Sequence, residues 1–205
     1  IRAFVAFCLT ASAVYIVNDI LGVEEDRAHP EKKHRPIAKG TVSYFEAYIL
    51  LGILLGLAGI TAYAMDYRFV IILCGYFLMN LAYSFKLKDV VLLDVFVIAS
   101  GFMMRVVGGA YALNVEVSTW LVLCTLFVSL FLGFAKRRSE LVHVPASGVA
   151  GRKVLRRYSV TFLDQMLTIT AAGTLISYAL YTVAPRTLQV FGTDKLIYTT
   201  VFVIY

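Results

Sequence analysis

Residues 1–17, IRAFVAFCLTASAVYIV, run directly into residues 18–40, NDILGVEEDRAHPEKKHRPIAKG. The first stretch is almost wholly apolar, whereas the second places acidic and basic side chains next to one another. A membrane-spanning helix needs about 20 mostly apolar residues, and polar groups at the margin of a membrane are costly and usually functional. This junction therefore predicts a helix that leaves a membrane at a polar site.

Apolar stretches of this kind recur along the whole chain. Of the 205 residues, 60% are hydrophobic, which is typical of a polytopic membrane protein and unusual for a soluble domain. The alternation expected of a membrane β-barrel is not visible, so the stretches are predicted to be helices. They are residues 1–17, 42–64, 69–85, 90–113, 117–135, 159–184 and 195–205. The predicted fold class is all-α: a transmembrane helix bundle, in one membrane-embedded domain over residues 1–205.

The loops between these segments alternate in charge. Loops 18–41, 86–89 and 136–158 carry 14 of the 19 Lys and Arg residues. The opposing loops carry only Arg68, Arg186 and Lys195. Because basic loops stay on the cytoplasmic side of a membrane, we expect a multi-pass protein of the plasma membrane. Its active face and its central polar cavity are expected to open to the cytoplasm.

The acidic residues of the first loop have the spacing of a metal site. If the first helix continues past Val17, Asp19 and Asp26 lie two turns apart and share a face, and Asn18 and Glu25 share an adjacent face. Oxygen ligands suit Mg²⁺, which binds proteins through one or two carboxylates together with substrate phosphate. A solvated acidic loop is the alternative, but the polar residues follow the apolar helix directly, which favours a function.

Basic residues follow these acids at once. An arginine offers a planar fork to a phosphate, and a lysine offers a point charge. A loop that served only to orient the protein in the membrane would not need acidic residues among the basic ones. Pro36 and Gly40 are predicted to turn the chain into the next helix. The basic residues are Lys32, Lys33, Arg35 and Lys39.

A second cluster lies in residues 83–105, YSFKLKDVVLLDVFVIASGFMMR. Lys86 and Lys88 are placed at the charged end of one helix. Asp94 falls about one turn into the next apolar helix, where a charged carboxylate requires a metal or a cation. Arg105 is three turns further on the same face. It either points into the cavity or extends to the far membrane surface, and the sequence leaves both open.

A third cluster, AKRRSEL at 135–141 followed by GRKVLRRY at 151–158, sets seven basic residues against one acid, Glu140. Such a loop can simply fix topology and attract anionic lipid. It can also form a wall that binds substrate phosphates, and the two roles are compatible.

The charged block resembles a known signature. ND at 18–19, VEEDR at 23–27 and RPIAKG at 35–40 are similar to the UbiA superfamily of intramembrane prenyltransferases, in the branch of decaprenyl-phosphate phosphoribosyltransferases. The resemblance continues in the family order through residues 83–105 and KRRSEL at 136–141. It implies a helix bundle around a central cavity, of which this chain would lack the N-terminal helix and the C-terminal helices.

The resemblance also implies an activity. Phosphoribose would pass from 5-phosphoribosyl diphosphate to a polyprenyl (decaprenyl) phosphate, with Mg²⁺ as cofactor and diphosphate as leaving group, to supply arabinan precursors for the cell envelope. The implied catalytic residues are Asp19, Asp26 and Asp94. The implied metal ligands are Asn18, Asp19, Glu24 and Asp26. The implied substrate-binding residues are Lys32, Lys33, Arg35, Tyr83, Lys86, Lys88, Arg105, Lys136, Arg137 and Arg138.

One position departs from the signature. Gly22 stands where the family normally has its second Asp, so either one metal ligand is missing or Glu24 or Glu25 replaces it.

Two other functions remain open. A UbiA-type prenyltransferase would move a prenyl group from a prenyl diphosphate to an aromatic or lipid acceptor, but an apolar donor needs fewer basic residues. A non-catalytic lipid-binding or transport protein would leave the acidic block without a role. A homo-oligomer is compatible with the sequence, the lipid bilayer is the expected environment, and no nucleic-acid partner is expected.

Overall fold

The structure is a computed structural model that describes residues 1–143 and 153–204. Within these ranges all regular elements are helical, which confirms the predicted fold class. In the described part of the chain, six helices are long and apolar enough to cross a membrane. They are α1 (Arg2–Leu21), α4 (Tyr44–Tyr63), α5 (Tyr67–Phe85), α6 (Leu93–Ala112), α7 (Thr119–His143) and α8 (Val160–Val183).

Short helices make up the connections. Between α1 and α4 the chain forms α2 (Val23–Ala28), the 3₁₀ helix η1 (Lys32–His34) and α3 (Pro36–Lys39). The 3₁₀ helix η2 (Leu87–Asp89) joins α5 to α6, and η3 (Lys153–Arg157) precedes α8. The predicted last helix, 195–205, is instead a short 3₁₀ helix and one helical turn that packs on α8. After α8 the elements are α9 (Pro185–Phe191), η4 (Lys195–Thr199) and α10 (Thr200–Ile204).

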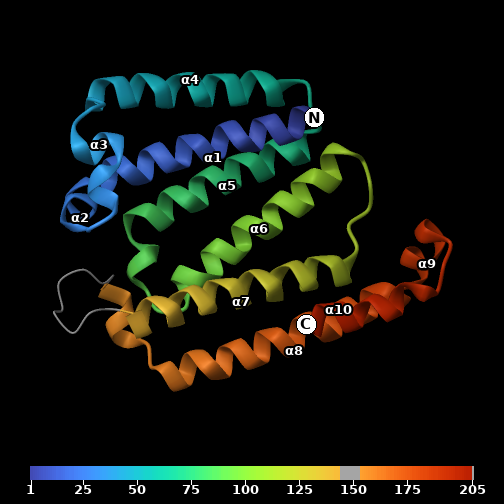
Figure 1. The fold of residues 1–205 in the computed structure, drawn as a ribbon. Helices are drawn as coiled ribbons and strands as arrows, with labels where there is room; N and C mark the ends of the chain where they lie inside the picture. Colours follow the sequence, from blue (N-terminus) through green and yellow to red (C-terminus); the bar gives the residue numbers. More distant parts are fainter. Residues whose placement is uncertain (144–152, 205) are drawn as a thin grey trace.

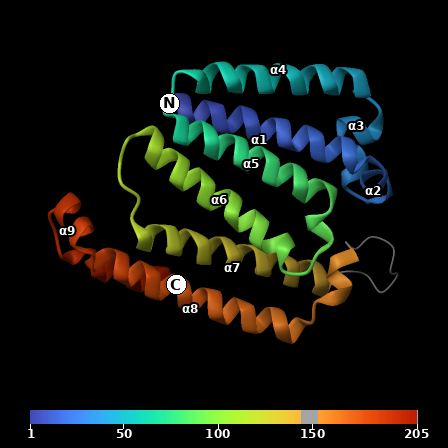
Figure 2. The same cartoon turned by 180° about the vertical axis from the view of Figure 1, so that it is seen from behind.

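The long helices lie side by side in the order α4, α1, α5, α6, α7, α8 (Figures 1 and 2). Each one packs mainly against its neighbours in this row. The order follows the chain except that α1 is inserted between α4 and α5. The charged block at the end of α1 therefore lies within the row, beside the connection from α5 to α6.

The chain runs up and down through this row, so its connections gather at two ends. Elements α2, η1, α3, η2 and η3 lie at one end, at the left of Figure 1, and are called here the charged end. The connections from α4 to α5 and from α6 to α7 lie at the other end, with α9. The structure thus brings together the three charged clusters, as the alternation of loop charge predicts.

Tight packing fixes the relative positions of these helices. The ring of Phe7 in α1 meets the rings of Phe69 and Tyr76 in α5 edge to face, at 5.5 and 5.6 Å between centroids. A Cβ atom on Gly133 of α7 would lie 2.5 Å from a methyl carbon of Val95 in α6. Only glycine allows α6 and α7 to approach so closely, which is how membrane helices commonly pack.

Candidate functional site

The end of α1 carries the first charged residues. The helix extends to Leu21, so Asn18 and Asp19 are helical. The Gly22 N–H donates to the Asn18 carbonyl at 2.9 Å, and the Asp26 N–H donates to the Gly22 carbonyl at 2.8 Å. Gly22 lies in neither helix, so Asp19 in α1 and Asp26 in α2 belong to two separate helices that meet at this residue.

Asp19 and Asp26 converge on a single nitrogen atom. Arg35 Nη1 lies 2.7 Å from Asp19 Oδ1 and 2.9 Å from Asp26 Oδ2. The Asp26 side chain is only 9% exposed, while that of Arg35 is 37% exposed. A carboxylate buried to this degree needs a cation beside it. Asp19 and Asp26 are called here the carboxylate pair.

The local sequence explains why Arg35 reaches the pair. Pro36 occupies the first turn of α3, where its missing N–H costs nothing. Gly40 ends that helix with φ of 81°, a conformation that favours glycine. Arg27 Nε donates to the Ala38 carbonyl at 3.1 Å and ties α2 to α3. The block from 18 to 40 therefore folds back on itself and holds Arg35 over α1 and α2.

The pair has the chemistry of a magnesium site completed by substrate. Mg²⁺ prefers oxygen ligands and keeps several waters, and it binds through one or two carboxylates plus substrate phosphate. Among residues 1–143 and 153–204, no group of three or more His, Cys, Asp or Glu side chains could hold a metal ion. Two convergent carboxylates, without a third His, Cys, Asp or Glu side chain among the described residues, fit a metal whose remaining ligands include water and phosphate oxygens.

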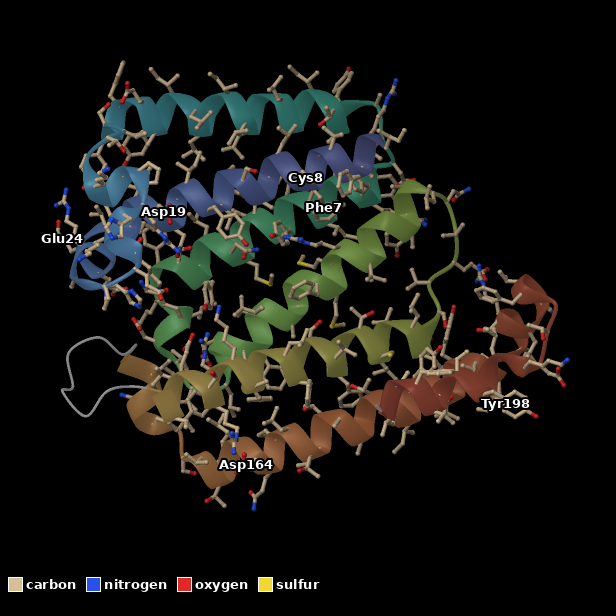
Figure 3. All side chains as sticks on the ribbon, in the orientation of Figure 1. Phe7, Cys8, Asp19, Glu24, Asp164 and Tyr198 are labelled. Atoms are coloured by element: carbon tan, nitrogen blue, oxygen red, sulfur yellow. The ribbon has the colours of Figure 1, made fainter. Side chains whose placement is uncertain are left out.

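Glu24 is not brought to the pair. Its side chain is 81% exposed and forms an ion pair with Arg27 Nη1 at 2.9 Å. Two positions before Asp26, it lies on the opposite side of α2. Figure 3 shows Glu24 at the outer edge of the charged end, away from Asp19. The sequence placed Glu24 among the metal ligands, and the helical geometry of α2 separates it from them.

Basic residues from two connections lie at the same end of the bundle as the pair. Lys32 lies close enough to Asp19 to act on it electrostatically. Lys88 Nζ, in η2, lies 3.3 Å from Glu25 Oε2 in α2, so the first and second clusters meet. Lys33 and Lys86 are exposed at the same end. The charged end thus offers several cations within one region for phosphate groups.

Asp94 lies in a second, closed arrangement. Its side chain is fully buried. Its Oδ2 accepts from Arg137 Nε at 2.6 Å, and its Oδ1 accepts from the Tyr158 hydroxyl at 2.6 Å. Arg137 Nη1 also donates to Glu140 Oε2 at 2.8 Å, and the Leu92 N–H donates to the Tyr158 oxygen at 2.8 Å. These five residues are called here the buried network.

In the buried network Asp94 and Arg137 pair with each other, a contact that the sequence did not predict. Asp94 was expected to hold a second metal or ribose hydroxyls, and Arg137 a phosphate. Both Asp94 oxygens are already hydrogen-bonded, and the Arg137 side chain is only 2% exposed. The cation that a buried carboxylate requires is supplied by α7 itself. The network joins α6, α7 and the segment before α8.

Tyr158 is the residue that sequence reasoning missed. Burial raises the pKa of the Tyr158 phenol, and its hydrogen bond to Asp94 raises that pKa further, so the hydroxyl remains a hydrogen-bond donor at neutral pH. It also holds Leu92, whose φ of 70° is unusual for a residue other than glycine. Nothing in the sequence distinguishes Tyr158 from the other tyrosines, because its partners lie 64 and 66 residues away.

The remaining predicted residues are spread over α5, α6 and α7. Tyr83 acts electrostatically on Arg137. Lys136 is exposed, and Arg138 forms an ion pair with Asp164 of α8. Figure 3 shows Asp164 on α8 at this charged end. Of the predicted 151–158 cluster, residues 151 and 152 lie outside the described residues.

Arg105 lies in the second half of α6, and its side chain is exposed. It is twelve residues along α6 from Leu93. Its Nη2 donates to the Tyr76 hydroxyl of α5 at 2.7 Å, and its guanidinium carbon lies 5.3 Å from the centroid of the Tyr76 ring. The side chain therefore turns toward α5 and does not extend to the far surface.

Comparison with known proteins identifies the family of this chain. The sequence matches the UbiA prenyltransferase family over residues 1–204. The chain belongs to the UbiA prenyltransferase family. With its six apolar helices, it is an integral membrane protein. The family resemblance drawn from the charged block is confirmed.

Two curated relatives of this UbiA chain carry the name decaprenyl-phosphate phosphoribosyltransferase. The protein of Mycolicibacterium smegmatis is 37% identical over 87% of this chain and 56% of its own length. That of Corynebacterium glutamicum is 38% identical over 87% of this chain and 54% of its own length. The chain therefore spans a little over half the length of these relatives.

The fold is also similar to a solved structure of the same family. A UbiA homolog from Archaeoglobus fulgidus bound to GPP and Mg²⁺ aligns with a TM-score of 0.81 at 18% identity. The alignment covers 98% of this chain and 72% of that one. At this identity the likeness establishes the helical fold alone.

Proposed function

We propose that this UbiA chain carries out Mg²⁺-dependent transfer of 5-phosphoribose from 5-phosphoribosyl diphosphate to a polyprenyl phosphate. The observation that carries the proposal is the convergence of Asp19 and Asp26 on one cation position at the charged end. The names of the curated relatives support the choice of substrates. Cell-envelope arabinan synthesis is the pathway that this product would serve.

The carboxylate pair would hold Mg²⁺, and the ion would neutralise the leaving diphosphate. The bond from ribose C1 to the diphosphate oxygen breaks, its electron pair leaves with diphosphate, and a lipid phosphate oxygen bonds to C1. That oxygen is already anionic, so the reaction needs no strong general base. Positioning and charge stabilisation by the protein would supply most of the rate.

The basic residues of the charged end would position the phosphate groups. Arg35 contacts the pair, Lys32 acts on Asp19 electrostatically, and Lys88 contacts Glu25. Lys33 and Lys86, exposed at the same end, would add two further cations. The donor brings a diphosphate and a 5-phosphate, and the acceptor brings a third anionic group. This demand for positive charge matches the excess of basic residues. The same excess supports a cytoplasmic position of the charged end in the plasma membrane.

Transfer of a prenyl group is the second candidate. It is favoured by one observation, the binding of GPP and Mg²⁺ by the A. fulgidus homolog. It would use the same carboxylate pair, because magnesium again assists the departure of diphosphate. Prenyl transfer involves fewer phosphate groups, so it gives the basic residues outside the carboxylate pair fewer anions to bind.

A competition between donors tests the proposal. Full-length protein in nanodiscs receives 5-phosphoribosyl diphosphate and geranyl diphosphate together, with decaprenyl phosphate and an aromatic acid as acceptors. Mass spectrometry identifies the product. We expect phosphoribosyl-lipid phosphate to form. Formation of a prenylated aromatic acid alone would replace the first candidate by the second, and the absence of both products would contradict each.

A further inference from the structure

Arg35 occupies the position that a metal ion would take at the carboxylate pair. Arginine commonly binds carboxylates through two nitrogens of its fork. Here both carboxylates meet the same nitrogen, Nη1, at 2.7 and 2.9 Å. Asp19 Oδ1 and Asp26 Oδ2 are thus gathered around one cationic atom. This is the arrangement of ligands around an ion, with the guanidinium in the place of that ion.

A magnesium ion and this guanidinium nitrogen cannot share the position. Magnesium binds oxygen at about 2.0–2.1 Å, so its oxygens would have to leave Nη1. Two cations at such short range also repel strongly where water is partly excluded. Metal binding therefore requires the Arg35 side chain to move.

The Arg35 side chain is free enough to leave the carboxylates, and it could then bind a nearby phosphate. Its side chain is 37% exposed, and Arg35 lies in the link between η1 and α3, outside both helices. A guanidinium released from carboxylates is well suited to bind a phosphate. The diphosphate of the donor substrate would lie against the metal, within reach of this link.

We propose that Arg35 is a resident counter-ion of the carboxylate pair, that Mg²⁺ displaces it, and that the displaced guanidinium binds the donor's diphosphate. The identity of the donor rests on the function proposed above, but the displacement does not. Without metal, Arg35 keeps the buried Asp26 neutralised. When Mg²⁺ and diphosphate are both bound, the carboxylate pair contacts Mg²⁺ and the Arg35 guanidinium contacts the diphosphate. Each ligand therefore favours the binding of the other.

The affinity for metal in the absence of substrate tests the displacement. Mn²⁺ serves as the probe, because free and bound Mn²⁺ are distinguished by electron paramagnetic resonance. The protein is the full chain in nanodiscs. Removing a charge-assisted competitor by Arg35→Gln should tighten Mn²⁺ binding by on the order of tenfold.

Lys39→Gln is the matched control. It removes one positive charge from an exposed side chain at the end of α3, four residues from Arg35. Its effect on Mn²⁺ affinity should be much smaller. If Mn²⁺ binds equally more tightly to both variants, the change in net charge alone explains the effect, and the proposal is overturned. Unchanged or weaker Mn²⁺ binding in Arg35→Gln would also overturn the proposal. If Arg35 only held the two carboxylates in place, its removal would weaken Mn²⁺ binding.

A measurement on the unaltered protein covers the case in which Arg35→Gln fails to fold. Phenylglyoxal modifies accessible guanidinium groups, and peptide mass spectrometry quantifies its reaction with Arg35. Addition of Mg²⁺ alone should increase modification several-fold, and inorganic diphosphate added with Mg²⁺ should suppress it. Modification that Mg²⁺ leaves unchanged or decreases would contradict displacement. No turnover is measured, so the result is independent of which group the enzyme transfers.

Discussion

At the scale of single residues, Gly22 is the position at which this chain departs from its family signature. Its φ of −98° is open to any amino acid, and a Cβ atom would meet only the Asn18 carbonyl oxygen, at 3.0 Å. Its backbone is hydrogen-bonded to both Asn18 and Asp26. A small shift would therefore admit a side chain at the junction of α1 and α2, the two helices that carry the carboxylate pair.

Replacement of Gly22 by Asp should strengthen the metal site. A third carboxylate adds an oxygen ligand and a negative charge, so we expect Mn²⁺ to bind several-fold more tightly in paramagnetic resonance titrations. Gly22→Asn adds a side chain of the same size without the charge and serves as control. Unchanged or weaker affinity in Gly22→Asp would show that position 22 does not face the metal.

At this scale the sequence anticipated that Asp19 and Asp26 lie close together, and both carboxylates contact Arg35 Nη1. The helical repeat alone does not explain this, because Gly22 separates α1 from α2. Arg35 reaches them only because α3 folds back over α1, and no repeat predicts that path. Asp94 was correctly expected to need a cation, but the cation is Arg137, 43 residues away.

At the scale of elements, the buried network holds three segments of the charged end together. Tyr158 precedes α8, Asp94 opens α6, and Arg137 lies in the last third of α7. In a low-dielectric interior an unpaired member of such a network is costly.

Loss of the Tyr158 hydroxyl should destabilise this junction. Tyr158→Phe keeps the ring but leaves the Leu92 N–H and one Asp94 oxygen without a partner. We expect a loss of about 1–3 kcal/mol in the free energy of unfolding, measured by denaturant titration in detergent. Tyr198→Phe removes a hydroxyl from a residue that is 71% exposed and should be neutral. Equal stability of the two variants would contradict the role of Tyr158.

A double substitution separates a structural Asp94 from a catalytic one. Asp94→Asn leaves Arg137 with the partly exposed Glu140 as its charge partner, and breaking a buried pair costs about 3–5 kcal/mol. Adding Arg137→Met removes this incompletely paired buried charge and should restore both the unfolding midpoint and turnover. If Asp94 held a metal or the ribose, the double variant would regain stability and remain inactive.

Most elements could be predicted from hydropathy, but their ends could not. Five internal segments correspond to α4, α5, α6, α7 and α8. Helix α7 continues to His143, past the predicted end at 135, because Lys and Arg are good helix formers and do not stop a helix. The segment 195–205 is apolar enough for a helix, yet it starts as a 3₁₀ helix.

At the scale of the whole molecule, the positions of the three clusters follow from the alternation of the chain. Six spans that run up and down place every second connection at the same end. The side-by-side order of the helices could not be predicted, because an apolar face that contacts lipid and one that contacts another helix look alike in sequence. The position of α1 between α4 and α5, which brings Glu25 to Lys88, required the structure.

The orientation of the charged end can be measured directly. In a variant without native cysteines, Lys39→Cys at the charged end and Thr193→Cys at the opposite end are labelled in intact cells with a membrane-impermeant maleimide. We expect reaction at position 193 and none at position 39 until the membrane is opened. The reverse pattern would place the charged end outside and remove its access to a cytoplasmic phosphoribosyl donor.

The most direct test of the central claim is phosphoribosyl transfer by full-length protein in nanodiscs, with wild type compared with Asp19→Asn and Asp26→Asn. Phosphoribosyl-lipid phosphate is quantified by mass spectrometry during titration with Mg²⁺ and after chelation. The account predicts product that requires Mg²⁺ in the wild type, and loss of turnover in both variants while they remain folded. Full activity in both variants, or product that survives chelation, would contradict the assignment of the carboxylate pair.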